Sequence, residues 1–156
     1  MLLGESYDER SDVYSFSIIM WQLLFEETTI FCSSYSQDPK FRMFMTQEML
    51  EQFSKIKMES CMGVPKLILD GIRPPTPTLP LRMENTKHVE WVQQFIKPHD
   101  QLFSSGNRDL DTNMRVLDGL FALNEQCWHR EMELRPSFTF ILEELKRLLN
   151  LLGEHV

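Results

Sequence analysis

The segment Ser11–Phe25, which reads SDVYSFSIIMWQLLF, restricts the possible folds of this chain more than any other. At 3.6 residues per turn, its large apolar side chains occupy nearly every side of a helix instead of one stripe. Such a helix is stable in water only where other elements enclose it. Ser15, Ser17 and Gln22 interrupt the apolar run, which is shorter than the roughly 20 residues of a membrane span. The segment is therefore predicted to be a central helix buried in protein.

The polar residues at the start of this segment predict where the helix begins. Ser11 and Asp12 have short side chains with oxygen atoms that can accept hydrogen bonds from the free N–H groups of a first turn. Either residue is therefore a candidate N-cap.

Apolar periodicity elsewhere predicts a single domain of the all-α class. Helices are expected at Thr46–Lys57, Val89–Ile96 and Asn113–Cys127, and a last helix is expected after Pro136 and Ser137. A short helix at Pro65–Leu69 would begin at its proline and end at Gly71. No stretch alternates convincingly at the period of two that a half-buried strand requires.

The remaining segments are predicted to be connections. Glu26–Lys40 and the polar Ser104–Asn113 are expected to be loops, the second a candidate inserted segment. Arg73–Pro80, RPPTPTLP, is expected to be extended, and its two P-x-x-P matches fit either a plain connector or a ligand of SH3-type domains. The methionine-rich run FRMFMTQEML fits either core packing or an adaptable docking surface.

Charge and composition argue against several functional classes. The net charge of −7 and the pI near 5.1 disfavour a general nucleic-acid binder or a binder of anionic membranes. The three cysteines, Cys32, Cys61 and Cys127, are odd in number and show no CxxC spacing, and the histidines show no metal-binding spacing. No disulfide framework and no metal site are therefore expected. The N-terminal MLLGESYDER lacks the features of a signal peptide, and a reducing, cytoplasmic location is predicted.

Three blocks of the sequence together resemble one protein family. Tyr7–Phe25 is similar to Y-x-x-K-S-D-V-Y-S-F-G-I-x-L-W-E-L, and Ile68–Pro77 is similar to I-x-x-G-x-R-P-x-x-P. Cys127–Leu145 is similar to C-W-x-x-x-P-x-x-R-P-S-F-x-x-I-x-x-x-L. In this order the blocks resemble the C-terminal lobe of a eukaryotic protein kinase domain of the tyrosine-kinase-like group, within the wider serine/threonine kinase group.

The resemblance implies that residues 1–156 form one partial kinase domain covering helices F to I, with insertions within 32–62 and 82–112. Asp12 matches the aspartate of the F helix that accepts hydrogen bonds from the backbone of the catalytic loop. Arg135 matches the arginine that pairs with the glutamate of the A-P-E motif. The full set of residues with structural roles by resemblance is Asp12, Trp21, Arg73, Trp128, Arg135 and Pro136.

The sequence also departs from the family pattern at two positions in these blocks. Ser17 stands where the family usually has glycine, and Met132 falls in the turn where the family often has proline. The close packing of the central helix at Ser17 and the geometry of the turn at Met132 are therefore expected to differ from those of the family.

The motifs that carry phosphoryl transfer are missing from the sequence. The glycine-rich loop, the lysine, H-R-D, D-F-G and the magnesium-binding asparagine all precede A-P-E in the family, and this chain begins a few residues after that point. Asp109–Asn113, DLDTN, lacks the surrounding motif. No catalytic, cofactor-binding or metal-binding residue is therefore expected, and ATP and Mg²⁺ would belong only to a complete parent kinase.

The truncation predicts two further properties. Asp12 and Arg135 would be orphaned without their family partners, and the F helix would leave an apolar surface uncovered. Marginal stability, or a protein partner on that surface, is therefore expected.

Three interpretations remain open. The chain is a kinase fragment that is inactive alone, a noncatalytic pseudokinase-like module that binds a protein through its G-helix face, or a truncated gene product. Neither a nucleic acid nor a membrane is an expected partner.

Overall fold

The computed structural model describes residues 9–29, 31–54, 56, 67–77, 80–96 and 110–153. Within these ranges the chain forms helices and no strand, which confirms the all-α class. The elements are α1 (Glu9–Phe25), η1 (Ser33–Ser36), α2 (Pro39–Arg42), α3 (Gln47–Ser54), α5 (Thr86–Trp91), the π-helical η2 (Val92–Ile96), α6 (Leu110–Cys127), η4 (Met132–Leu134) and α7 (Phe138–Leu151).

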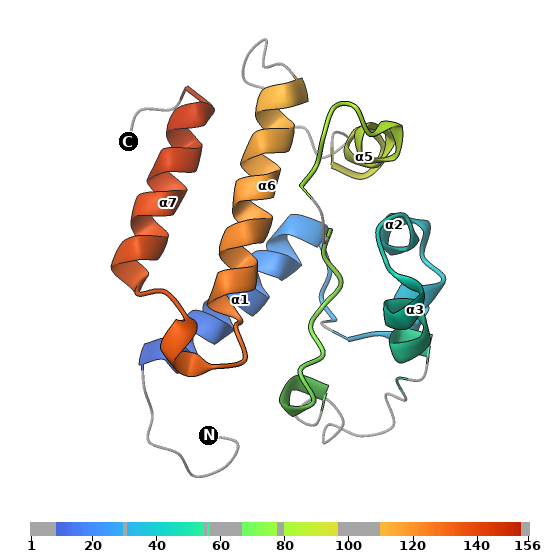
Figure 1. Ribbon diagram of the computed structural model, residues 1–156, viewed down its shortest axis with the longest axis horizontal. Helices are drawn as coiled ribbons and strands as arrows, with labels where there is room; N and C mark the ends of the chain where they lie inside the picture. The colour runs from blue at the N-terminus through green and yellow to red at the C-terminus, as the bar shows by residue number, and fades with distance from the viewer. Residues whose placement is uncertain are drawn as a thin grey trace.

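The helices form two groups on either side of α1. In Figure 1, α6 and α7 lie side by side and run in opposite directions, and α1 crosses behind α6. The shorter α2, α3 and α5 lie on the other side, and an extended segment, Ile72–Pro77, runs between the two groups.

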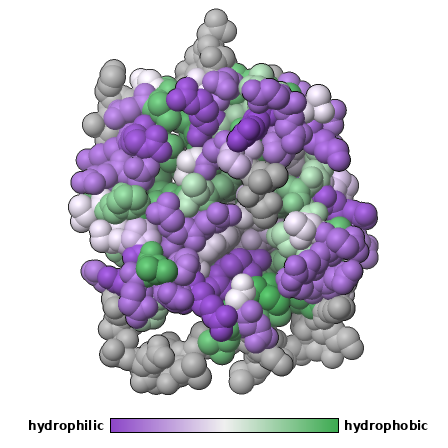
Figure 2. All heavy atoms as spheres, in the orientation of Figure 1, coloured by the Kyte–Doolittle hydropathy of each residue, from purple (hydrophilic) through white to green (hydrophobic). Residues whose placement is uncertain are grey.

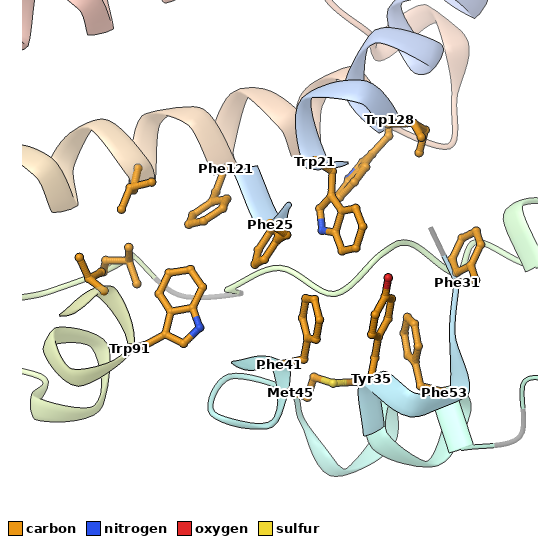
Figure 3. Close-up of a cluster of buried hydrophobic side chains, with 14 of the residues drawn as sticks. Trp21, Phe25, Phe31, Tyr35, Phe41, Met45, Phe53, Trp91, Phe121 and Trp128 are labelled. Carbon is orange, nitrogen blue, oxygen red and sulfur yellow. The ribbon is translucent and has the colours of Figure 1, made fainter. Parts of the chain in front are cut away.

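The central position predicted for α1 is confirmed on two of its sides. One side contributes Trp21 and Phe25 to an aromatic cluster, which also contains Phe31, Tyr35, Phe41, Met45, Phe53, Trp91, Leu117, Phe121 and Trp128. In Figure 3, Trp21 and Phe25 point toward Phe41 and Tyr35, while Trp91 reaches the same cluster from α5. The other side packs on α6 and α7 through a helix-pair cluster of Val13, Met20, Leu123, Cys127 and Ile141.

The start of α1 differs from the sequence prediction. The helix already includes Glu9, so Ser11 and Asp12 lie inside the helix and the N-cap prediction is wrong. Glu9 and Asp12 both lie in the first turn, where carboxylates interact favourably with the helix dipole. The guanidinium of Arg10 donates to the Met132 carbonyl at 3.2 Å, which ties this turn to η4.

The end of α1 at Phe25 agrees with the prediction. Glu26 adopts a positive φ of 54°, and the N–H of Glu27 donates to the Gln22 carbonyl at 3.1 Å. This is the Schellman arrangement, in which a left-handed residue ends the helix. The ammonium group of Lys40 also donates to the Phe25 carbonyl, so a cation lies at the negative end of the helix dipole.

The prediction of a loop at Glu26–Lys40 is wrong in part. The chain forms η1 there and then begins α2 at Pro39, and the Asp38 carboxylate accepts from the Lys40 N–H at 2.8 Å. An aspartate followed by proline at the first helical position is a helix-start signal. This short helix buries Phe41 completely.

The methionine-rich run packs against the core. Met45 is buried, while Met43, Phe44 and Met49 lie partly buried against the aromatic cluster. The core-packing interpretation of this run is therefore supported. Of the helix predicted at Thr46–Lys57, α3 covers the central part, the Thr46 hydroxyl accepts from the Met49 N–H at 3.2 Å, and Lys57 lies outside the described residues.

The described part of RPPTPTLP is extended, as predicted, but its central residues lie in the interior. Pro74, Pro75, Thr76 and Pro77 are all buried. The PPTP match is therefore inaccessible to a peptide-binding domain, which supports the connector interpretation. Residues 78 and 79, within the second match, lie outside the described residues.

Two other boundaries were predicted too late in the chain. The helix expected from Val89 begins at Thr86, because the Asn85 side chain caps it by accepting from the Lys87 N–H at 3.1 Å. Leu110 already belongs to α6, so the prediction of a loop over Ser104–Asn113 is wrong for residues 110–113. Residues 104–109 lie outside the described residues.

Other expectations agree with the described structure. Leu67–Leu69 are helical and end at Gly71, whose φ of 83° favours glycine, while Pro65 lies outside the described residues. The Ser137 hydroxyl caps α7 by accepting from the Phe140 N–H at 3.3 Å.

Two further properties follow from the described structure. Cys127 is buried, and burial raises the pKa of its thiol to about 12, while Cys61 lies outside the described residues. Within the described ranges, none of the helices combines the length and the apolar character needed to cross a bilayer.

Candidate functional site

Two of the residues singled out by the family resemblance, Arg73 and Arg135, lie against Tyr14 on the inner side of α1. The guanidinium carbon of Arg73 lies 5.4 Å from the centroid of the Tyr14 ring, and that of Arg135 lies 5.1 Å from it. Both distances are within the range of a cation–π contact. We call Tyr14, Arg73 and Arg135 the arginine–tyrosine cluster.

Arg73 fixes the extended segment to the loop after α6. Its Nε donates to the Trp128 carbonyl at 2.9 Å, and its Nη1 donates to the carbonyls of Ile68 and Ile72 at 3.1 Å each. Burial lowers the pKa of this guanidinium, an effect that the nearby Arg130 reinforces and Tyr14 opposes. Three backbone carbonyls accept hydrogen bonds from Arg73, so its side chain holds these segments of the chain together.

Arg135 connects the loop before α7 to the first turn of α1. Its Nε donates to the His129 carbonyl at 2.8 Å, and its Nη1 donates to the Arg10 carbonyl at 3.0 Å. The expectation that Arg135 is orphaned is therefore wrong. Backbone carbonyls can satisfy a guanidinium without a carboxylate partner, because its five N–H groups need only acceptors.

Tyr14 holds a buried hydroxyl between these arginines. The hydroxyl oxygen has no hydrogen-bond partner among the described residues. Burial raises the pKa of Tyr14, and the positive charges of Arg73 and Arg135 oppose that shift. The phenol is therefore held neutral, and none of the described residues places a base within hydrogen-bonding distance of its hydroxyl.

Hydrogen bonds join the three family-like blocks of the sequence in a closed ring. The indole N–H of Trp21, in the first block, donates to the carbonyl of Pro75, in the second, at 3.0 Å. Arg73 of the second block bonds to Trp128 of the third, and Arg135 of the third bonds back to Arg10 of the first. Each block thus makes a directional contact with both of the others.

Asp12 and Pro136 lie apart from this ring of hydrogen bonds. Asp12 is exposed on α1, so the side chain is open to solvent. Pro136 is half-buried and directly precedes Ser137, the cap of α7. Neither Asp12 nor Pro136 therefore belongs to the ring of hydrogen bonds or to the arginine–tyrosine cluster.

A groove with a volume of about 600 Å³ adjoins the cluster. One wall is α3, the floor is the extended segment, and the other wall is the end of α6 with the loop that follows. Its lining consists of Met49, Gln52, Phe53, Asp70, Gly71, Ile72, Arg73, Pro74, Thr76, Glu125, Trp128, His129 and Arg130. The face drawn in Figure 2 is mostly hydrophilic, with hydrophobic residues in separate small groups.

The polar groups of the groove do not form a recognisable catalytic arrangement. Burial raises the pKa of Glu125, while a hydrogen bond from the Thr76 hydroxyl lowers it. His129 lies in the turn, where its Nδ1 accepts from the Glu131 N–H at 3.1 Å. Over the described ranges, His, Cys, Asp and Glu side chains form no group of three that could hold a metal ion. The prediction that the chain binds no ATP or Mg²⁺ remains a prediction.

The sequence identified part of this cluster and of the ring of hydrogen bonds. The resemblance points to Trp21, Arg73, Trp128 and Arg135, which take part in the ring. It does not point to the carbonyls of Arg10 and Pro75, because a backbone acceptor carries no side-chain signal, nor to Tyr14 as the ring on which both arginines lie.

Comparison with known proteins finds no matching family model, no matching curated protein and no matching solved structure.

Proposed function

We propose that this chain is a C-terminal-lobe fragment of a tyrosine-kinase-like protein kinase domain, covering helices F to I and unable to transfer phosphate by itself. The parent activity would be the ATP-dependent phosphorylation of serine, threonine or tyrosine in proteins. In this proposal α1 corresponds to the F helix, the turn at Leu67–Leu69 to the end of the G helix, and α6 and α7 to the H and I helices.

The closed ring of hydrogen bonds is the observation that carries the proposal. The three blocks were selected from motif similarity alone, and they are separated by long stretches of unrelated sequence. The contacts Trp21–Pro75, Arg73–Trp128 and Arg135–Arg10 are those that the proposal requires of blocks that pack together in one lobe.

The proposal includes catalytic incompleteness and a cytoplasmic location. The sequence contains no H-R-D, D-F-G or glycine-rich nucleotide loop, and phosphoryl transfer depends on all three. The odd number of cysteines without CxxC spacing is consistent with a reducing compartment.

Two experiments test the proposal. The coding sequence immediately upstream of Met1 should contain an open frame for H-R-D, D-F-G and A-P-E, and a frame without them would contradict the assignment to a kinase. Thermal unfolding of the purified chain should not change with ATP and Mg²⁺, because ligand binding to the native state raises the melting temperature. A rise that saturates with ATP concentration would contradict catalytic incompleteness.

The groove supports a second candidate function, a noncatalytic module that binds a protein partner. The groove lies beside Gly71 and Ile72, directly after the segment assigned to the G helix, and combines apolar walls with Asp70, Glu125 and Arg130. Charge reversals on this side of the molecule, within Arg42–Lys57 or at Arg130, should abolish capture of a partner. Unchanged capture would argue against this face.

A further inference from the structure

The third side of α1 carries large apolar residues that none of the described helices covers. Ile19 is 56% exposed and Leu23 is 74% exposed. They follow Phe16 at spacings of three and four, so the three residues form one row along the helix. Phe16 marks the inner edge of this row, because it packs against the helix-pair cluster.

A second apolar row lies on α7 and meets the first. Phe138 is 43% exposed and Leu142, one turn later, is 53% exposed. The rings of Phe16 and Phe138 contact edge to face, with centroids 6.1 Å apart. The two rows therefore join at this contact, and we call them together the α1–α7 strip. Scattered apolar residues are normal on a surface, but a joined strip on two helices is typical of a docking site.

The charges beside the strip indicate the kind of partner. On α1 the exposed residues are Glu9, Asp12, Ser15, Ile19 and Leu23, so every charge among them is negative. The one basic residue of α1, Arg10, points its guanidinium to the Met132 carbonyl of η4. On α7 the exposed charged residues are Glu143, next to Leu142, and then Lys146 and Arg147. The edge along α1 is therefore acidic, and the exposed basic residues of α7 follow the strip toward the C-terminal end of that helix.

We infer that the α1–α7 strip binds an amphipathic helix of a partner protein, with an apolar stripe for the strip and lysine or arginine residues along the edge facing α1. A helix fits because the strip presents rows at helical spacing, as in helix-in-groove recognition. A second copy of the chain fits less well, since its net charge is −7 and its own α1 would bring Glu9 and Asp12 to the same contact. This inference goes beyond the kinase assignment, because it depends only on exposure and charge.

Two synthetic helical peptides with the same leucine stripe test the inference. One carries lysine at the flanking positions and the other carries glutamate, and the fluorescence anisotropy of labelled peptide measures binding to the purified full chain. The lysine peptide should bind about tenfold more tightly than the glutamate peptide, because charge complementarity selects between partners. Leu23→Ser should weaken the lysine peptide about tenfold, as expected when a central apolar contact is lost.

The control variants separate docking from folding. Leu23 is mostly exposed, so Leu23→Ser should leave the circular dichroism spectrum and the melting temperature unchanged. Met83, 44% exposed in the turn before α5, provides a matched apolar control, and Met83→Ser should leave peptide affinity unchanged. Asp12→Lys should remove much of the preference for the lysine peptide over the glutamate peptide.

Four results would overturn the inference. Equal affinities of the two peptides would contradict the role of the acidic edge in favouring a basic partner helix. No measurable binding of either peptide would contradict docking of a helix on the strip. Unchanged binding by Leu23→Ser would place the contact elsewhere. A dimer in light scattering that Leu23→Ser converts to a monomer would assign the strip to a second copy of the chain.

Discussion

At the scale of single residues, Asn124 is the least well satisfied group in the described structure. Its side chain is completely buried in α6. Neither its amide nitrogen nor its amide oxygen has a hydrogen-bond partner among the described residues. A buried polar atom without a partner costs roughly 1–3 kcal/mol of stability.

Asn124→Leu should therefore raise the free energy of unfolding by about 1–2 kcal/mol, because leucine of similar volume has no polar atom to desolvate. Urea denaturation followed by circular dichroism measures the change. Ser17→Ala is the matched control, since Ser17 is equally buried but its hydroxyl donates to the Tyr14 carbonyl at 2.6 Å. That variant should not gain stability, and a loss in Asn124→Leu would show that the amide is satisfied in solution.

At the scale of elements, the packing of α6 on α7 depends on a glycine in the middle of α6. A Cβ atom at Gly119 would lie 2.4 Å from Cδ2 of Leu148, and Leu148 is buried. Glycine normally weakens a helix by up to about 1 kcal/mol relative to alanine. At this position, however, the missing side chain is what lets the two helices approach.

Gly119→Ala should lower the free energy of unfolding by about 1–3 kcal/mol, the usual cost of overpacking a core, despite the better helix propensity of alanine. A double-mutant cycle with Leu148→Ala provides the control, because the truncated leucine leaves room for the new Cβ. The two changes together should cost less than the sum of their separate effects. A stabilising Gly119→Ala would mean that Leu148 moves aside at no cost.

The elements also show what the sequence could and could not predict. Long periodic helices such as α6 and α7 were expected correctly, because burying one face against a neighbour imposes a repeat that a sequence displays. The short α2 and the early start of α5 were missed, because their stability depends on a single cap, Asp38 or Asn85, and on burial of Phe41 or Trp91. Arg135 was expected to be unpaired because acceptors on the backbone cannot be seen in a sequence.

At the scale of the whole molecule, α1 and α6 each contribute to both hydrophobic clusters. Trp21 and Phe25 belong to the aromatic cluster, while Val13 and Met20 belong to the helix-pair cluster. All three tryptophans of the chain, Trp21, Trp91 and Trp128, lie in the aromatic cluster. Tryptophan fluorescence therefore reports on one cluster, and far-ultraviolet circular dichroism reports on the helices of both.

The sharing of α1 and α6 predicts that the two clusters unfold together. Ile141→Ala removes buried volume only from the helix-pair cluster and should cost about 2–5 kcal/mol. The urea midpoint measured by fluorescence should nevertheless fall as much as the midpoint measured by circular dichroism, because the aromatic cluster cannot persist once α1 has lost its other face. Met83→Ala, at an exposed turn, should move neither midpoint. If Ile141→Ala shifts the dichroism transition and leaves the fluorescence transition in place, the clusters are independent units, and the shared helices α1 and α6 do not couple them.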